Sequence, residues 1–131
     1  MNGIERIPDD VLGFLDTYIR SVDQLEILLL LHTRSDRVWS ARAVSDELRS
    51  NEDGAALRLE DLARHGLVAV AYENGRAFRY QLTGDRHALV ARVAFTYQDF
   101  RLRMIERIFT KPDGLREFAS AFRLRSVKGE K

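Results

Sequence analysis

The stretch from Trp39 to Thr83 constrains the fold more than any other part of the chain. Its apolar spacing predicts two short helices, one over residues 40–48 and one that ends before Gly66. Glycine is common just after a helix because it takes the left-handed conformation without steric cost. Two strand-like runs, VAVAY and AFRYQL, then flank Asn74 and Gly75. Asn-Gly predicts a hairpin, since a type I′ turn needs positive φ at both central residues.

Helix, turn, helix and hairpin in this order resemble the winged helix-turn-helix superfamily, and within it the MarR-like and ArsR-like bacterial regulators. The resemblance rests on Ser40 through Leu48, on Ala55, Leu59 and Leu62, on Gly66-Leu67-Val68, on Gly75-Arg76, and on Tyr80-Gln81-Leu82-Thr83. It implies a mainly α fold with a small β-hairpin wing, in which N- and C-terminal helices flank the winged helix-turn-helix. It also implies that the second helix enters a DNA major groove and that the terminal helices form a homodimer.

The length of 131 residues predicts a single domain that is large enough for its own core. Within residues 1–131 we expect an N-terminal helix in 1–20, the winged helix-turn-helix in 21–83 and a C-terminal helical dimerisation region in 84–131. Ser21 and Gln24 form an S-x-x-Q capping box, which predicts the start of a central core helix that ends near Thr33.

Apolar residues at helical spacing predict a helix over residues 8–19 and a long helix that ends near Phe109. The first packs on the C-terminal helix of its own chain, joins a dimer interface, or does both. The apolar stripe of the second is wider than one winged domain usually covers, and such surface marks an interface. The candidate dimer-interface residues are Leu12, Leu15, Leu89, Val93, Tyr97, Phe100, Met104 and Ile108. A last helix is predicted over 115–124, followed by a basic tail that either solubilises the chain or contacts phosphates.

The net charge of +1 conceals a division along the chain. Residues 1–65 carry a net charge of −5 and residues 66–131 carry +6, so the helix-turn-helix half is acidic. The outward positions of the second helix include Asp53, Glu60 and Asp61. This distribution is unusual for a DNA-binding protein, because phosphate contacts need cations near the recognition helix.

The wing is the more favourable region for DNA, because Arg76 follows the Asn-Gly turn. In the resembling families an arginine at this place reaches the minor groove or the backbone; the alternative is a solvated hairpin arginine. Either Asn51 or Ser50 caps the second helix. The candidate DNA-binding residues are Ser40, Arg42, Asn51, Ala56, Leu57, Arg58, Arg76 and Arg79.

No catalytic motif occurs in the sequence: GxxxxGK[ST], GxSxG and HExxH are all absent. Without cysteine the chain has no disulfide and no thiolate metal site, and His32, His65 and His87 are scattered. We therefore predict no enzyme activity, no catalytic residue, no metal site and no cofactor. We also expect a cytoplasmic protein without a membrane partner, because the apolar run 27–31 is far shorter than a membrane span.

Two functions follow from these observations. The first is a dimeric regulator of transcription that binds double-stranded DNA. The second is a winged helix that binds a protein partner through its acidic recognition helix, with weak or no DNA binding.

Overall fold

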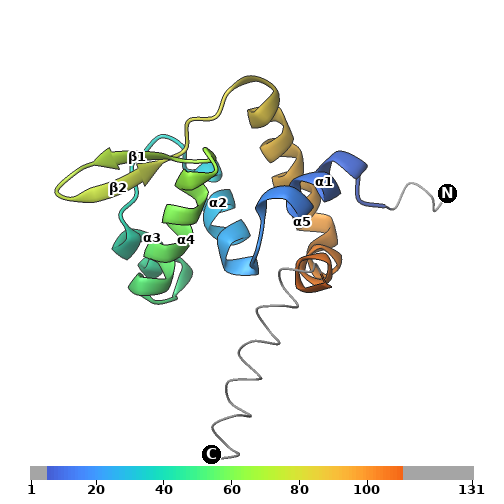
Figure 1. Cartoon of the computed structure of the whole chain (residues 1–131), viewed down its shortest axis with the longest axis horizontal. Helices are drawn as coiled ribbons and strands as arrows, with labels where there is room; N and C mark the ends of the chain where they lie inside the picture. The colour runs from blue at the N-terminus through green and yellow to red at the C-terminus, as the bar shows by residue number, and fades with distance from the viewer. Residues whose placement is uncertain (1–5, 111–131) are drawn as a thin grey trace, which may run out of the picture.

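The computed structural model of the chain describes residues 6–110. Within that range lie the helices α1 (Asp9–Tyr18), α2 (Val22–Thr33), α3 (Ala41–Leu48), α4 (Glu52–Arg64) and α5 (Gly84–Thr110), and the strands β1 (Ala69–Tyr72) and β2 (Arg76–Arg79). Helices α2, α3 and α4 with the β1–β2 hairpin form a winged-helix fold, as the sequence predicts. In Figure 1 the hairpin projects from one side, α1 and α5 lie on the other, and α2 lies between them.

Three helices begin at a side chain that accepts a backbone N–H, which satisfies a donor without an intrahelical partner. Ser21 Oγ accepts the Gln24 amide at 3.1 Å, and Ser40 Oγ accepts the Ala43 amide at 3.1 Å. Asn51 Oδ1 accepts the Gly54 amide at 2.6 Å, so Asn51 rather than Ser50 caps α4. The buried Gln24 departs from an ideal capping box, because its Oε1 accepts the Arg20 amide at 2.7 Å.

The turn between α3 and α4 has a strained residue. Arg49 closes α3 with φ 56° and ψ 50°, in the left-handed region that favours glycine. A residue with a Cβ adopts this region at a cost. Arg49 therefore adopts, between the two helices, a conformation that glycine takes without this cost.

The wing is a two-stranded antiparallel hairpin in which Tyr72 pairs with Arg76, so three residues form the loop. Asn74 and Gly75 both have positive φ, at 58° and 125°, as predicted for this pair, but a three-residue loop replaces the two-residue type I′ turn that the sequence predicts. Trp39 adds a bridge to the hairpin, because its N–H donates to the Phe78 carbonyl at 2.7 Å and its C=O accepts the Phe78 amide at 2.8 Å. The Trp39 side chain is buried, only 1% exposed, so it belongs to the core.

Helix α5 packs on α1 and α2 over a shared apolar core. The buried residues of α5 include Val90, Val93, Met104 and Ile108. The helix is bent at Phe100, where φ is −124° and ψ is 35°. No helix within residues 6–110 is both long enough and apolar enough to cross a membrane.

This packing corrects part of the predicted dimer interface. Leu15, Val93, Met104 and Ile108 are at most 1% exposed, so they belong to the core of one chain. The spacing identified an apolar face of α5 correctly, but α1 and α2 of the same chain cover it. Leu12, Leu89, Tyr97 and Phe100 pack on this core and are partly exposed. The predicted last helix, 115–124, and the basic tail lie outside the described residues.

Candidate nucleic-acid interface

Helix α4 has one buried face and one open face. Ala55, Leu59 and Leu62 point into the core and are at most 2% exposed, as the helical spacing predicts. Leu57 is 57% exposed, and Asp53 is exposed one turn before it. Ala56 and Arg58 flank this surface and are half-buried. The side of α4 that a major groove would meet is therefore formed by an apolar side chain and carboxylates.

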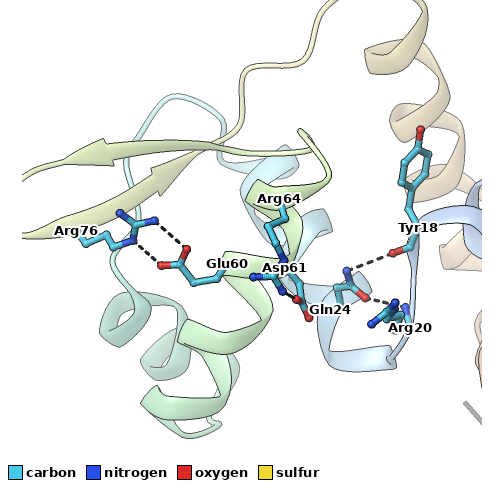
Figure 2. A network of polar contacts seen from close by, with 7 residues as sticks. All are labelled: Tyr18, Arg20, Gln24, Glu60, Asp61, Arg64 and Arg76. Atoms are coloured by element: carbon cyan, nitrogen blue, oxygen red, sulfur yellow. Dashed lines mark hydrogen bonds and ion pairs between the residues drawn. The ribbon is translucent and has the colours of Figure 1, made fainter. Parts of the chain in front are cut away.

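A bidentate ion pair between Arg76 and Glu60 joins the wing to α4 (Figure 2). Arg76 Nε donates to Glu60 Oε2 at 2.5 Å, and Nη2 donates to Oε1 at 2.8 Å. Arg76 Nη1 also donates to the Tyr72 hydroxyl at 3.2 Å. The hydrogen bond from Arg76 lowers the pKa of the Glu60 carboxyl, and the same bond raises the pKa of Arg76. Arg76 is exposed, but its charge is already shared with a carboxylate of the recognition helix.

A second carboxylate of α4 also has an arginine partner. Asp61 accepts a hydrogen bond from Arg64 one turn later on the same helix (Figure 2). The acidic character that the sequence indicates is therefore reduced in the fold, because Glu60 and Asp61 both face a guanidinium. Glu52 and Asp53 are the exposed carboxylates that remain in the first turn.

The other predicted contact residues divide into two groups. Ser40 and Asn51 cap α3 and α4, so their side-chain oxygens already accept backbone N–H groups. Arg42 is exposed on the first turn of α3, and Arg79 is half-buried at the end of β2. Arg58 lines a small cleft with Asn51 beside α2, at the turn between α3 and α4. The structure thus brings Arg58 and Asn51 together, and it places Arg76 over α4 rather than free at the wing tip.

The charge division of the sequence is explained by contacts within the chain. Arg92 pairs with Asp10 at 2.6 Å, Arg101 with Glu26 at 2.9 Å, and Arg107 with Asp16 at 2.5 Å. We call these three ion pairs, which join α5 to α1 and α2, the α5 seam. In each of them, and in the Arg76–Glu60 pair, the acid comes from the acidic half and the cation from the basic half.

Tyr97 lies beside the Arg101–Glu26 pair of the α5 seam, and its pKa is raised. Tyr97 donates its hydroxyl to Glu26 Oε2 at 2.9 Å, beside the Arg101 guanidinium. Burial, followed by the hydrogen bond to Glu26, raises the pKa of Tyr97 to about 12. Tyr97 is therefore a permanent hydrogen-bond donor between α5 and α2 at physiological pH.

Three aromatic side chains form a cluster that the sequence does not predict. His32 at the end of α2, Tyr80 after β2 and His87 in the first turns of α5 lie within 5.7 Å of one another, measured between ring centroids. Histidines far apart in sequence give no local pattern, which is why this pairing required the fold. Among residues 6–110, no group of three or more His, Cys, Asp or Glu side chains could hold a metal ion.

An exposed apolar row on α5 was also missed as a candidate interface. Phe95, Leu102 and Phe109 are 70%, 74% and 57% exposed, and they recur every seven residues. Phe95 lies before the bend at Phe100, and Leu102 and Phe109 lie after it. Large exposed apolar side chains grouped on one element mark an interaction surface.

Comparisons with known proteins identify the fold but no family. No protein-family model matches the sequence, and a search of curated proteins gives no match. The chain is similar in structure to the heme sensor protein PefR from Streptococcus agalactiae, solved in complex with heme, with a TM-score of 0.53 and 12% sequence identity. The similarity covers 95% of this chain and 85% of PefR. At this identity the likeness shows the fold alone.

Proposed function

We propose that the chain is a MarR-like, dimeric winged-helix regulator of transcription that binds double-stranded DNA and has no enzyme activity. The observation that carries the proposal is the arrangement of α4 and the wing. The open face of α4 and the hairpin are joined by Arg76 and Glu60, so that they form one continuous surface. A helix beside a projecting hairpin is the geometry by which winged helices meet a major groove and the adjacent backbone.

The chemistry of this surface favours backbone contacts over base recognition. Arg42, Arg58 and Arg79 offer guanidinium groups for phosphates, and Arg76 adds a fourth when it leaves Glu60. Ala56 and Leu57 offer apolar contact to thymine methyl groups. Ser40 and Asn51 position the two helices through their caps. The recognition helix contributes few donors to base edges, so specificity would depend on apolar contacts and on DNA shape.

The dimer would form through the exposed row Phe95, Leu102 and Phe109 rather than through the core residues of the apolar stripe. Leu102 and Phe109 are seven residues apart after the bend at Phe100, so they can meet the same residues of a second copy. Asp99, Arg103 and Glu106 lie between the apolar residues on α5, and their mixed charges allow one copy to pair with another. A two-fold dimer would place the recognition helices ~34 Å apart on a palindromic site.

Titration of fluorescent duplexes at several salt concentrations tests the DNA-binding part. A regulator should lose affinity linearly on a log–log plot against salt as counterions are released. On at least one duplex it should bind well below the non-specific range, Kd ~10⁻⁴–10⁻⁶ M. Uniform affinity within that range on every duplex, including fragments selected from a genomic pool, would contradict the proposal.

The dimer has its own test, because it does not require DNA. Leu102→Asp places a charge in the exposed row, and Leu57→Asp places the same charge on α4 as a matched control. Light scattering at tens of micromolar should show a dimer for the wild type and the control, and a monomer for Leu102→Asp. A monomeric wild type would reject the dimer.

A second function is favoured by the exposed Leu57 and by the engagement of Arg76. A recognition helix with a large apolar residue among carboxylates also suits a basic, apolar segment of a protein partner. In this alternative the Arg76–Glu60 pair is permanent and the chain does not bind DNA specifically. The heme bound by PefR is not extended to this chain, since a shared fold does not fix a ligand.

A further inference from the structure

The turn between α2 and α3 is a basic segment within the acidic half of the chain. Residues 34–42 contain three arginines and one aspartate, so their net charge is +2, whereas residues 1–65 together carry −5. The arginines are Arg34, Arg37 and Arg42, and all three are exposed. Positive charge is therefore concentrated where the chain leaves α2 and enters α3.

The side chain of Trp39 holds the arginines of this turn. The guanidinium carbon of Arg37 lies over the Trp39 ring, 3.9 Å from its centre, and that of Arg34 lies 5.9 Å from it. Trp39 is itself buried, and its indole N–H donates to the Arg34 carbonyl at 3.4 Å. Tryptophan is the ring that attracts a cation most strongly. Arg37 therefore has a fixed support, which lowers the entropy that it loses when it binds a ligand.

The contact with Trp39 leaves the hydrogen-bond donors of Arg37 free. A guanidinium meets a ring with its face, while its five N–H groups point outward in its own plane. Within residues 6–110, neither Arg34 nor Arg37 has a carboxylate partner or a side-chain hydrogen bond, and Asp36 between them pairs with neither. Arg76, by contrast, directs its donors at Glu60 and at a tyrosine hydroxyl.

The fold gives a separate reason for one of these two arginines. Arg34 is the C-cap residue of α2, where a positive charge is favourable because of the helix dipole. Arg37 lies three residues beyond that cap, so the dipole does not explain it. A purely structural role for Arg37 would be to cover the Trp39 ring. Such a role predicts no effect on the salt dependence of DNA binding.

The turn lies beside two elements that carry predicted DNA contacts. Trp39 exchanges two backbone hydrogen bonds with Phe78 of β2, at 2.7 and 2.8 Å, and Arg79 is the next residue of that strand. On its other side, Trp39 is followed by Ser40, which caps α3, and then by the exposed Arg42. The basic turn is therefore joined to the wing and to the start of α3.

We propose that residues 34–37 form a phosphate-binding site for the DNA backbone, in which Arg37 on its Trp39 support is the main contact and Arg34 the second. This inference rests on the proposed function and extends it, because neither arginine is among the candidate DNA-binding residues. The planar fork of a guanidinium matches the oxygens of a phosphate. The site adds affinity without base recognition, and it supplies positive charge that the acidic face of α4 lacks.

Arg37→Ala in the full chain tests the site by fluorescence anisotropy with a labelled duplex at several salt concentrations. The slope of log K against log salt should flatten by about one, as expected for one lost phosphate contact. Arg37→Lys keeps the charge and should keep the wild-type slope. Arg101→Ala is the matched control, since Arg101 is also exposed and lies near a ring, that of Tyr97, but pairs with Glu26. An unchanged slope in Arg37→Ala, or an equal change in Arg101→Ala, would overturn the site.

The emission of Trp39 gives a second readout, because Trp39 is the only tryptophan of the chain. Its ring is buried, so a change on addition of the duplex should come from the guanidinium above it. The wild type and Arg101→Ala should show this change with the same midpoint as the anisotropy, and Arg37→Ala should lose it. An equal change in Arg37→Ala would reject the site.

The two readouts also separate the site from the proposed function, because a duplex that is bound non-specifically suffices for both. Specific binding with an unchanged slope in Arg37→Ala would reject the site and leave the regulator in place. Uniform weak affinity with a flattened slope in Arg37→Ala would reject the regulator and support the site. A wild type that binds no duplex would reject both.

Discussion

Two contacts join the acidic and basic halves of this chain, and they differ in what lies beneath their ion pairs. The three pairs of the α5 seam lie at the border of a packed core that contains Val93, Met104 and Ile108. The Arg76–Glu60 pair instead joins the first residue of β2, next to the exposed wing loop, to α4.

Arginine–carboxylate pairs therefore have different roles in the α5 seam and at the wing. Exposed ion pairs contribute little stability by themselves, since water and salt screen them. In the seam the core determines the packing, and the ion pairs select the register of α5 against α1 and α2. At the wing the Arg76 guanidinium lies over the ring of the buried Phe78, but the pair itself is exposed, so another anion can compete with Glu60 for Arg76. A DNA phosphate is such an anion.

Loss of core packing beneath the α5 seam should have the largest effect on the free energy of unfolding. Met104→Ala removes a side chain with no exposed surface, which should cost ~2–5 kcal/mol in the free energy of unfolding. Arg107→Ala is the matched control on the same helix, because it removes the ion pair to Asp16 and leaves the core intact. Urea unfolding followed by Trp39 fluorescence measures both. Equal losses in the two variants would show that the seam depends on its charges.

Release of the wing arginine should strengthen DNA binding if the chain binds DNA. Glu60→Gln removes the carboxylate that holds Arg76, so Arg76 can bind a phosphate and the slope of log K against log salt should steepen by about one. Arg76→Ala should weaken binding on all sequences and flatten the slope by about the same amount. Fluorescence anisotropy at several salt concentrations measures both slopes.

Glu52→Gln provides the control for charge alone. It removes an exposed carboxylate from the first turn of α4, and that carboxylate is not among the groups that hold Arg76. If Glu52→Gln and Glu60→Gln change the slope equally, the effect comes from net charge and not from the release of Arg76.

Low pH should break the Arg76–Glu60 ion pair, and the pKa of Glu60 sets the pH range in which it breaks. The hydrogen bond from Arg76 lowers the pKa of Glu60, so the contact stabilises the fold above the ordinary value of 4.5 and is lost as the pH falls through the lowered value. The Arg76 Nε–H resonance should shift over that range in the wild type. In Glu60→Gln the resonance should not titrate there, and a shift that persisted would mean that another group holds Arg76.

Leu57→Ala should have the smallest effect on stability. Its side chain is 57% exposed, so the change should stay within about ±0.5 kcal/mol. Leu59→Ala, two residues away on the buried face, should cost ~2–5 kcal/mol by the same urea measurement. Equal losses would contradict the orientation of α4.

Local chemistry explains why the sequence predicts the elements well. The caps at Ser21, Ser40 and Asn51 and the glycine after α4 act within a few residues, so each is visible in a short window. The helical period likewise identifies the buried face of α4.

Contacts between residues far apart in the sequence leave no pattern in a short window, so local chemistry does not predict them. Arg76 and Glu60 are 16 residues apart, and their pairing depends on how the wing lies over α4. Periodicity located the apolar stripe of α5 but could not tell that α1 and α2 cover it, so core residues were assigned to a dimer interface. The candidate DNA-binding residues have positions in the fold, but their role remains a prediction.

The α5 seam also sets an order in which the chain can complete its fold during synthesis. Asp16 and Arg107 are 91 residues apart, so the ribosome makes nearly all of the described chain before α1 can meet its partner. Until then α1 lacks the helix on which it mainly packs, and closing so long a loop slows folding. A newly made chain that pauses before α5 therefore exposes an apolar helix on an acidic fragment, which is the state that chaperones would encounter.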